Sequence, residues 1–199
     1  KTFLDMVLKR FSERPDVPSF PSPKYRQCTS DLKRDPIKRE VRRYAKAHGF
    51  DRIVNCMGLR AEESSNRARQ DVFKASFDNG KAGRAWHEYL PIHALNTPAV
   101  FQTIRDAGQK PHWAYQDNER LSCITCIMAS TADLVHGARK NPDVYALMCF
   151  SEKVTEYALH ASMKYLPDLT GIQPDYSLLS EYQDLVSKFL NMRSYQKRI

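Results

Sequence analysis

Two cysteines three positions apart, Cys123 and Cys126, have the spacing that most directly suggests chemistry in this sequence. A C-x-x-C pair brings two sulfur atoms to one centre, which suits zinc, an iron–sulfur cluster or a redox pair of thiols. One pair supplies only two ligands, so a metal centre needs further donors. The sequence offers four candidates for that purpose: Cys28, Cys56, His112 and Cys149. Reduced thiols in a core or a loop are the alternative.

A second group of reactive side chains lies just before a predicted helix at Asp35–His48. It combines two basic residues, a thiol and a hydroxyl: Arg26, Cys28, Thr29 and Lys33. Asp35 and Pro36 have the residue types of a helix cap and a first helical position, so we expect the group in a loop at the helix N-terminus. The partial positive charge there attracts anions and activates thiols. A capped helix with solvent-exposed basic residues is the alternative.

A third group follows a short apolar run, Arg52–Met57, which predicts a buried strand of a parallel sheet. Ligands bind such sheets where the strands end, so the next loop is the place to expect a site. A glycine that permits a tight turn comes first, followed by three side chains that can hold phosphate or sulfate oxygens: Gly58, then Arg60, Ser64 and Arg67. The alternative is an exposed helix in which Glu63 pairs with Arg67.

The elements that must position these groups alternate between helix and strand. Apolar spacing predicts a second strand at Trp86–Ile92. It also predicts five further helices, at Thr2–Phe11, Thr97–Ala107, Asp133–Arg139, Pro142–Tyr157 and Leu178–Leu190. Helix, glycine, strand and glycine in succession are typical of an α/β unit. We therefore expect an α/β fold.

The charge and the cysteine content restrict the class of protein. A net charge of +8 over 199 residues favours a polyanionic partner, either nucleic acid or a phosphate-rich small molecule, with a generally basic surface as the alternative. No apolar run is long enough to span a bilayer, so no membrane partner is expected. Five cysteines without a visible signal peptide predict a cytoplasmic protein whose thiols serve metals or catalysis. The oligomeric state is not predicted.

The three groups, taken in order, resemble the phosphoadenosine phosphosulfate reductase family of PP-loop proteins. The matching text is R-x-C-T-x-x-L-K-x-x-P, then G-x-R-x-E-E-S-x-x-R, then N-E-R-L-S-C-x-x-C, within a resemblance that runs from about Phe3 to Phe150. It implies an adenine nucleotide alpha-hydrolase-like fold, a doubly wound parallel sheet flanked by helices, in residues 1–150. Residues 151–199 are expected to form a helical C-terminal extension. The family's Ser-Gly-Gly-Lys-Asp-Ser phosphate loop lies upstream of the first helix and is not in this sequence, which we interpret as truncation.

The resemblance also implies a function. The protein would bind ATP or a sulfonucleotide, with Mg²⁺ as a candidate ion, and would reduce or transfer a sulfur group. It implies catalytic roles for Cys28 and Arg60. The side chains implied to face the nucleotide or substrate are Arg26, Thr29, Lys33, Gly58, Arg60, Ser64, Arg67 and Arg120.

A four-iron four-sulfur cluster is implied as well. Cys28, Cys123 and Cys126 match three of the family's four cluster ligands, Thr29 stands where the fourth is expected, and Cys149 is a candidate replacement. The Glu-Cys-Gly-x-His segment of sulfonucleotide reductases is not found. The alternative function is therefore a nucleic-acid-associated accessory module of a mobile element or defence system. Such a module either modifies DNA or RNA with sulfur or keeps the fold without catalysis.

Overall fold

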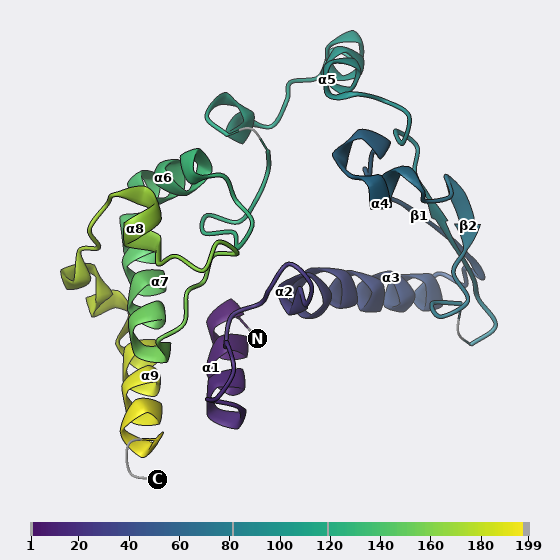
Figure 1. The fold of residues 1–199 in the computed structure, drawn as a ribbon. Helices are drawn as coiled ribbons and strands as arrows, with labels where there is room; N and C mark the ends of the chain where they lie inside the picture. The colour runs from purple at the N-terminus through teal and green to yellow at the C-terminus, as the bar shows by residue number, and fades with distance from the viewer. Residues whose placement is uncertain (1, 81, 119, 197–199) are drawn as a thin grey trace. The chain divides into compact units, whose positions relative to one another are not determined.

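The computed structural model describes residues 2–80, 82–118 and 120–196 and divides the chain into two compact units. Unit 1 comprises Lys1–Asp35 and Trp113–Ile199, and unit 2 comprises Pro36–His112. The described part of unit 1 is helical, whereas unit 2 combines helices with a small sheet (Figure 1). The protein therefore has a mixed α/β fold, as the sequence pattern predicted.

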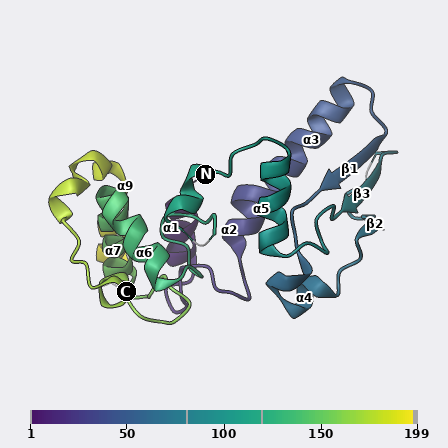
Figure 2. The ribbon, with the colours of Figure 1, turned by 90° about the horizontal axis from the view of Figure 1, so that it is seen from above.

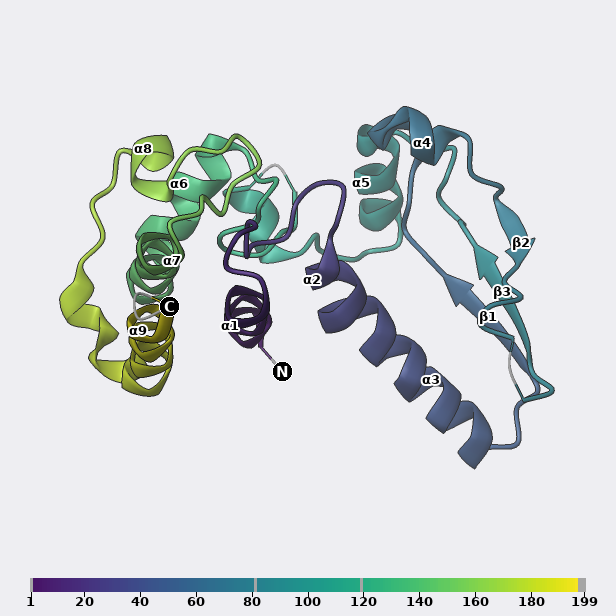
Figure 3. The ribbon, with the colours of Figure 1, turned by 60° about the horizontal axis from the view of Figure 1, so that its bottom comes forward.

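The sheet of unit 2 contains three described strands: β1 (Arg52–Cys56), β2 (Phe73–Ala75) and β3 (Ala85–Tyr89). Figure 3 shows β3 between the other two strands, with α3 (Asp35–Ala47) beside the sheet. β1 runs parallel to β3, with Val54 opposite His87, while β2 runs antiparallel to β3. The sequence predicted β1 as a strand of a parallel sheet and a second strand at Trp86–Ile92, which overlaps β3, although β3 ends at Tyr89. It did not predict β2, whose three residues are too few to give a periodic pattern.

The two faces of this sheet differ in burial. On one face, Trp86 is only 3% exposed, and the Arg42 guanidinium of α3 lies 5.7 Å from its ring centroid. Residues of the opposite face remain accessible, and Val54 of β1 is 54% exposed. The strand expected at Arg52–Met57 is therefore present, but its predicted burial is wrong. Its residues alternate between exposed and half-buried because α3 covers one face only.

The helix expected to begin at Asp35 begins earlier. α2 (Gln27–Thr29), η1 (Ser30–Arg34, a π-helical segment) and α3 follow one another without a break. Asp35 has helical dihedral angles and its N–H donates to the carbonyl of Ser30, so its predicted role as the helix cap is wrong. A proline inside a helix lacks an N–H and crowds the carbonyl four residues earlier. The wider π-helical turn directly before Pro36 is a common way to relieve that crowding.

Unit 1 is built around helices that share one apolar core (Figure 2). They are α1 (Phe3–Glu13), α6 (Thr131–Lys140), α7 (Pro142–Thr155), α8 (Leu166–Thr170) and α9 (Gln183–Gln196), with the 3-10 segment η4 (Tyr176–Tyr182) before α9. The predicted helix at Thr2–Phe11 is confirmed as α1, where Thr2 and Asp5 form a reciprocal capping box. Its residues Val7 and Leu8 are buried against the core.

The C-terminal segment packs within this same unit. α7 crosses the expected domain boundary at residues 150 and 151, and α9 lies beside it. The expected helical extension is thus helical where described, up to residue 196; residues 197–199 lie outside the described part of the chain. The predicted helix at Leu178–Leu190 is divided between η4 and α9. None of the described helices combines the length and the apolar character needed to cross a membrane.

Candidate functional site

The Cys123–Cys126 pair lies on a tight turn of unit 1. The N–H of Cys126 donates to the carbonyl of Cys123 at 3.2 Å, and the N–H of Ala129 donates to the carbonyl of Cys126 at 3.0 Å. Cys123 is exposed, whereas Cys126 is half-buried and packs against the core. The turn therefore presents one accessible thiol and anchors the other.

A glycine of α6 holds the turn in place. A Cβ atom added to Gly137 would lie 2.5 Å from the carbonyl oxygen of Ile124, a distance that real Cβ atoms do not tolerate. Only a residue without a side chain lets the helix approach the backbone between the two cysteines so closely. The Gly137–Ile124 contact thus couples α6 to the C-x-x-C turn.

Lys33 of η1 reaches the same turn from a distant part of the sequence. Its ammonium group donates to the sulfur of Cys123 at 3.5 Å, although the two residues lie 90 positions apart. This contact joins the second and the first of the reactive groups found in the sequence. An ammonium group beside an exposed thiol suits the binding of an anion or the stabilisation of negative charge on sulfur.

Arg26 lies in the expected loop, directly before α2, whereas Cys28 and Thr29 lie within α2. Cys28 is half-buried and has a free thiol. Among the described residues, no three His, Cys, Asp or Glu side chains gather closely enough to hold a metal ion. Two of the three implied cluster ligands, Cys123 and Cys126, nevertheless share one turn.

Cys149 occupies a different environment. It is buried on α7 within the apolar core, and that burial raises the pKa of its thiol to about 12. A thiol in such surroundings behaves as a small apolar side chain unless a metal replaces its proton. Cys56, by contrast, is exposed on β1 in unit 2.

Arg120 stabilises the segment that carries the C-x-x-C turn. Its guanidinium donates to the carbonyl oxygen of Met128, which closes the chain between the two residues into a loop. The preceding residue of the motif, Glu119, lies outside the described residues. Arg120 is therefore near the cysteines in sequence and braces their loop through a backbone contact.

In unit 2, Arg60 lies in a small polar network. Its guanidinium pairs with Glu62 of η2 (Ala61–Glu63) and donates to the hydroxyl of Thr97 at 2.9 Å. Thr97 begins α5 (Thr97–Asp106) and donates its own hydroxyl to Glu62 at 2.5 Å. The hydrogen bond from Thr97, together with the charge of Arg60, lowers the pKa of the Glu62 carboxyl. The Arg60 side chain is 16% exposed, so its guanidinium is well fixed.

Arg67 and its neighbours also find partners within unit 2. Arg67 pairs with Glu63, the helical pairing considered from the sequence, and its carbonyl oxygen lies 2.9 Å from Nε2 of His93. Ser64 caps the short helix α4 (Ser65–Ala68) by accepting from the N–H of Arg67 at 3.2 Å. A Cβ at Gly58 would meet only Ile92, at an ordinary 3.7 Å, so the local packing does not require a glycine there.

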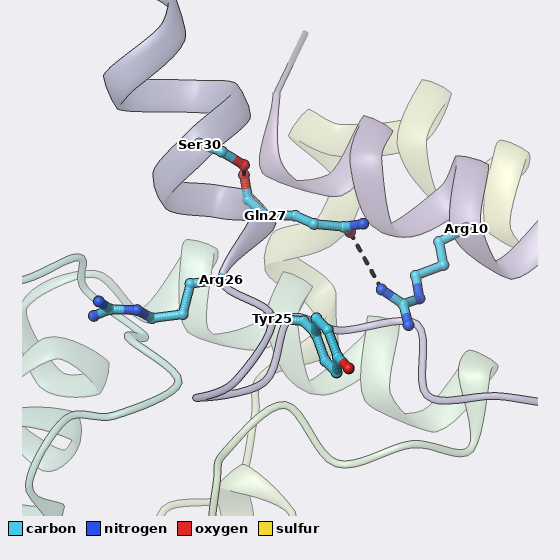
Figure 4. Close-up of a pocket in the computed structure, with 5 residues that line it drawn as sticks. All are labelled: Arg10, Tyr25, Arg26, Gln27 and Ser30. Carbon is cyan, nitrogen blue, oxygen red and sulfur yellow. Dashed lines mark hydrogen bonds between the residues drawn. The ribbon is translucent and has the colours of Figure 1, made fainter. Parts of the chain in front are cut away.

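A pocket in unit 1 adds residues that the sequence patterns missed. It is open, has a volume of about 420 Å³, and is lined by Arg10, Tyr25, Arg26, Gln27 and Ser30 (Figure 4). Arg26 was a predicted binding residue, but Arg10 and Tyr25 were not. Arg10 has the usual character of a basic residue in the last turn of a helix, so its sequence position gave no signal.

Comparison with known proteins identifies a phage protein of similar sequence. The chain is 29% identical over 136 residues to an "Uncharacterized 37.8 kDa protein in gpa 5'region" of Escherichia phage 186. The match covers 68% of this chain and 40% of the phage protein, so the chain spans less than half of that relative. No protein-family model matches the chain, and no solved structure matches it.

Proposed function

We propose that this protein performs adenine-nucleotide-dependent sulfur chemistry of the phosphoadenosine phosphosulfate reductase-like type. The observation that carries the proposal is the contact between Lys33 and Cys123, which links two of the three family-like motifs in space. The parallel pairing of β1 with β3 is compatible with part of a doubly wound sheet. That larger sheet, with the PP-loop fold it implies, belongs to the proposal.

In this proposal the sulfur chemistry lies at the C-x-x-C turn. Cys123 offers an accessible thiol, Cys126 anchors the turn, and Lys33 balances negative charge that develops on sulfur or on an incoming sulfate-like group. Cys28 is the third cysteine of the proposed four-iron four-sulfur cluster, which would supply electrons or bind a sulfur atom. The described residues fit that cluster in part, since they bring two of its ligands onto one turn.

The nucleotide is assigned to the arginines of unit 2. Arg60 and Arg67 are proposed to bind the phosphate or sulfate oxygens of ATP or a sulfonucleotide, accompanied by Mg²⁺. Each is now paired with a glutamate, Glu62 or Glu63, so an anionic ligand would have to compete with that carboxylate. Such pairing keeps a guanidinium oriented before its ligand arrives.

The charge distribution favours a second candidate function, that of a nucleic-acid-associated module. Unit 2 contains 14 Lys and Arg residues against 8 Asp and Glu residues, so it carries +6 of the net charge of +8. A net positive charge attracts the phosphate backbone of nucleic acid. A nucleic-acid substrate for sulfur transfer would combine both candidates.

The cysteine assignment can be tested with protein purified without oxygen. Iron and acid-labile sulfide are measured in the unchanged protein and in Cys28→Ser, Cys123→Ser and Cys126→Ser variants. We expect iron in the unchanged protein and its loss from each variant, whereas Cys56→Ser is the matched control and should retain it. Iron-free protein, or iron that survives all three substitutions, would refute the cluster.

The nucleotide assignment needs a separate measurement. Binding of ATP and of adenylyl sulfate is followed by calorimetry in the presence and absence of Mg²⁺. Saturable binding that Arg60→Ala weakens supports the proposal. If neither nucleotide binds to the full-length protein, the adenine-nucleotide chemistry is wrong and the nucleic-acid module is the remaining candidate.

A further inference from the structure

The pocket of unit 1 contains two positive charges without a matching negative one. Arg10 donates to the side-chain oxygen of Gln27 at 3.3 Å, and no carboxylate of the described residues pairs with Arg10 or Arg26. Arg60 and Arg67 in unit 2 are, in contrast, each neutralised by a glutamate. The guanidinium groups around this pocket are thus available to an external anion, unlike those of Arg60 and Arg67.

An aromatic ring is held between these charges. Tyr25 is 61% exposed, and in the view of Figure 4 the Arg10 and Arg26 side chains extend to opposite sides of it. Its backbone is fixed at both ends, because its N–H donates to the hydroxyl of Ser22 and its carbonyl accepts from the N–H of Gln27. Lys24 adds a further positive charge 5.5 Å from the ring centroid. An exposed ring on a fixed backbone suits stacking.

We propose that this pocket binds single-stranded nucleic acid. One base stacks on Tyr25, and the phosphates on either side of that nucleotide contact Arg10 and Arg26. An aromatic ring flanked by basic side chains is the arrangement that proteins use for unpaired bases. A strand supplies a phosphate on each side of the stacked base, which matches two guanidinium groups that lie on opposite sides of the ring in the view of Figure 4. A 5′-nucleotide such as AMP or ATP carries its phosphates on one side only, and a duplex keeps its bases stacked on one another.

This inference deepens the second candidate function and rests on it, but it does not depend on the sulfur chemistry. It names the strand type and the residues that bind it. The pocket lies on the segment that leads into η1, and Arg26, directly before α2, is seven positions from Lys33 of η1. A strand held here would lie in the same unit as the Cys123–Cys126 turn.

Fluorescence anisotropy with a labelled single-stranded oligonucleotide of about 15 nucleotides tests the proposal. Tyr25→Ala should raise the dissociation constant about 5- to 150-fold, the range of one lost base-stacking contact, while Tyr25→Phe should bind like the unchanged protein. Arg10→Ala and Arg26→Ala should each reduce the slope of log K against log salt by about 0.7, the value for one phosphate of a single strand. The matched control is Arg14→Ala, which removes the same charge from an arginine already paired with Asp16.

Two competitors separate the strand from related ligands. An unlabelled strand of the same sequence should displace the probe, whereas AMP and the matching duplex should do so only at much higher concentration. Equal competition by AMP would overturn the proposal in favour of a mononucleotide pocket. Tyr25→Ala and Arg10→Ala variants that bind the strand as tightly as Arg14→Ala would overturn it as well. Neither result would bear on the iron content of the cysteine variants.

Discussion

The ammonium group of Lys33 lies 3.5 Å from the sulfur of Cys123, although 90 positions of sequence separate the two residues. Lys33 comes from the π-helical segment η1, and Cys123 from the exposed end of the C-x-x-C turn. The contact places a fixed positive charge beside an accessible thiol. It is the structural relationship on which the proposed sulfur chemistry depends most directly.

Removing that charge should slow the reaction of Cys123 with an alkylating reagent. The substitution Lys33→Met removes the ammonium group that lies beside the Cys123 sulfur. We therefore expect alkylation of Cys123 by iodoacetamide at neutral pH to slow about two- to fivefold. This range corresponds to an exposed charge pair of up to ~1 kcal/mol. Mass spectrometry of the Cys123 peptide gives the rate, and exposed Cys56 in unit 2 serves as the internal reference.

Lys33→Arg should retain most of the rate, because it keeps the positive charge. Lys24→Met, which removes a lysine elsewhere in unit 1, should leave Cys123 unaffected. An unchanged rate in Lys33→Met would mean that the contact has no chemical consequence.

The packing of α6 on the cysteine turn leads to a second prediction. Gly137→Ala places a methyl group against the Ile124 carbonyl, so the turn or the helix must move. We expect a loss of about 1–3 kcal/mol in the free energy of unfolding, the usual cost of overpacking. Urea denaturation measures it. Gly58→Ala is the matched control, since a Cβ there meets Ile92 at ordinary contact distance and should cost much less.

These two relationships differ in how far the sequence could predict them. The ordered motifs predicted Lys33 as a nucleotide- or substrate-binding residue and Cys123 as a cluster ligand, and the structure brings the two side chains together within unit 1. Gly137 lies within the predicted helix at Asp133–Arg139, where the apolar spacing does not single it out. Its physical role depends on which backbone atom of another segment approaches it, and no local pattern contains that information.

Each feature that the sequence predicted wrongly or missed has an identifiable physical cause. Asp35 and Pro36 have the residue types of a helix start, but the π-helical turn before them lets the helix continue through the proline. The apolar run of β1 indicated a buried strand, yet Val54 is exposed because α3 covers the other face. Arg10 and Tyr25 come together from separate segments, so spacing along the chain could not identify their pocket.

The arginine network of unit 2 gives a third prediction. If Arg60 binds a phosphate, Arg60→Ala should weaken the binding of ATP by about 1.5–3 kcal/mol, the scale of a hydrogen bond to a charged group. Glu62→Gln should strengthen it, because the carboxylate that now pairs with Arg60 no longer competes with the ligand. Calorimetry measures both affinities. Arg69→Ala removes a nearby arginine that donates to the side-chain oxygen of Asn66 at 2.6 Å, and it should have little effect.

The same pair of variants separates two roles for Arg60. A purely structural ion pair predicts that Arg60→Ala and Glu62→Gln both lower the melting temperature and leave ATP affinity unchanged. A ligand-binding arginine predicts opposite changes in affinity. Affinity that does not respond to either substitution removes Arg60 from the nucleotide site.

The last prediction concerns a buried carboxylate in the core of unit 1. Glu152 of α7 is 1% exposed and accepts hydrogen bonds from the N–H groups of Leu159 at 2.7 Å and Leu166 at 2.9 Å. Burial raises the pKa of Glu152 to about 6, from an ordinary value of 4.5, although the two backbone N–H groups act in the opposite direction. The folded protein therefore binds this proton more tightly than the unfolded chain does.

The sign of the pH dependence follows from that difference. The contribution of Glu152 to stability is greatest below about pH 4.5 and is lost as the pH rises through about 6, a change of about 2 kcal/mol. Other carboxyl groups titrate over the same range, so the informative quantity is the difference in unfolding free energy between the unchanged protein and Glu152→Gln. We expect this difference to decrease by about 2 kcal/mol between pH 4.5 and pH 7 in urea denaturation.

The substitution also tests how the carboxylate fixes the chain after α7. A glutamine has one acceptor oxygen for two N–H groups, whereas a carboxyl group keeps an oxygen for each, so Glu152→Gln should be less stable than the unchanged protein, most of all at low pH, where Glu152 is neutral. Glu13→Gln, which alters an exposed carboxylate paired with Lys9, should show no comparable pH-dependent difference. A constant difference between the unchanged protein and Glu152→Gln across this pH range would mean that Glu152 titrates alike in the folded and unfolded states. The two backbone hydrogen bonds would then hold a carboxylate whose burial has no net electrostatic cost.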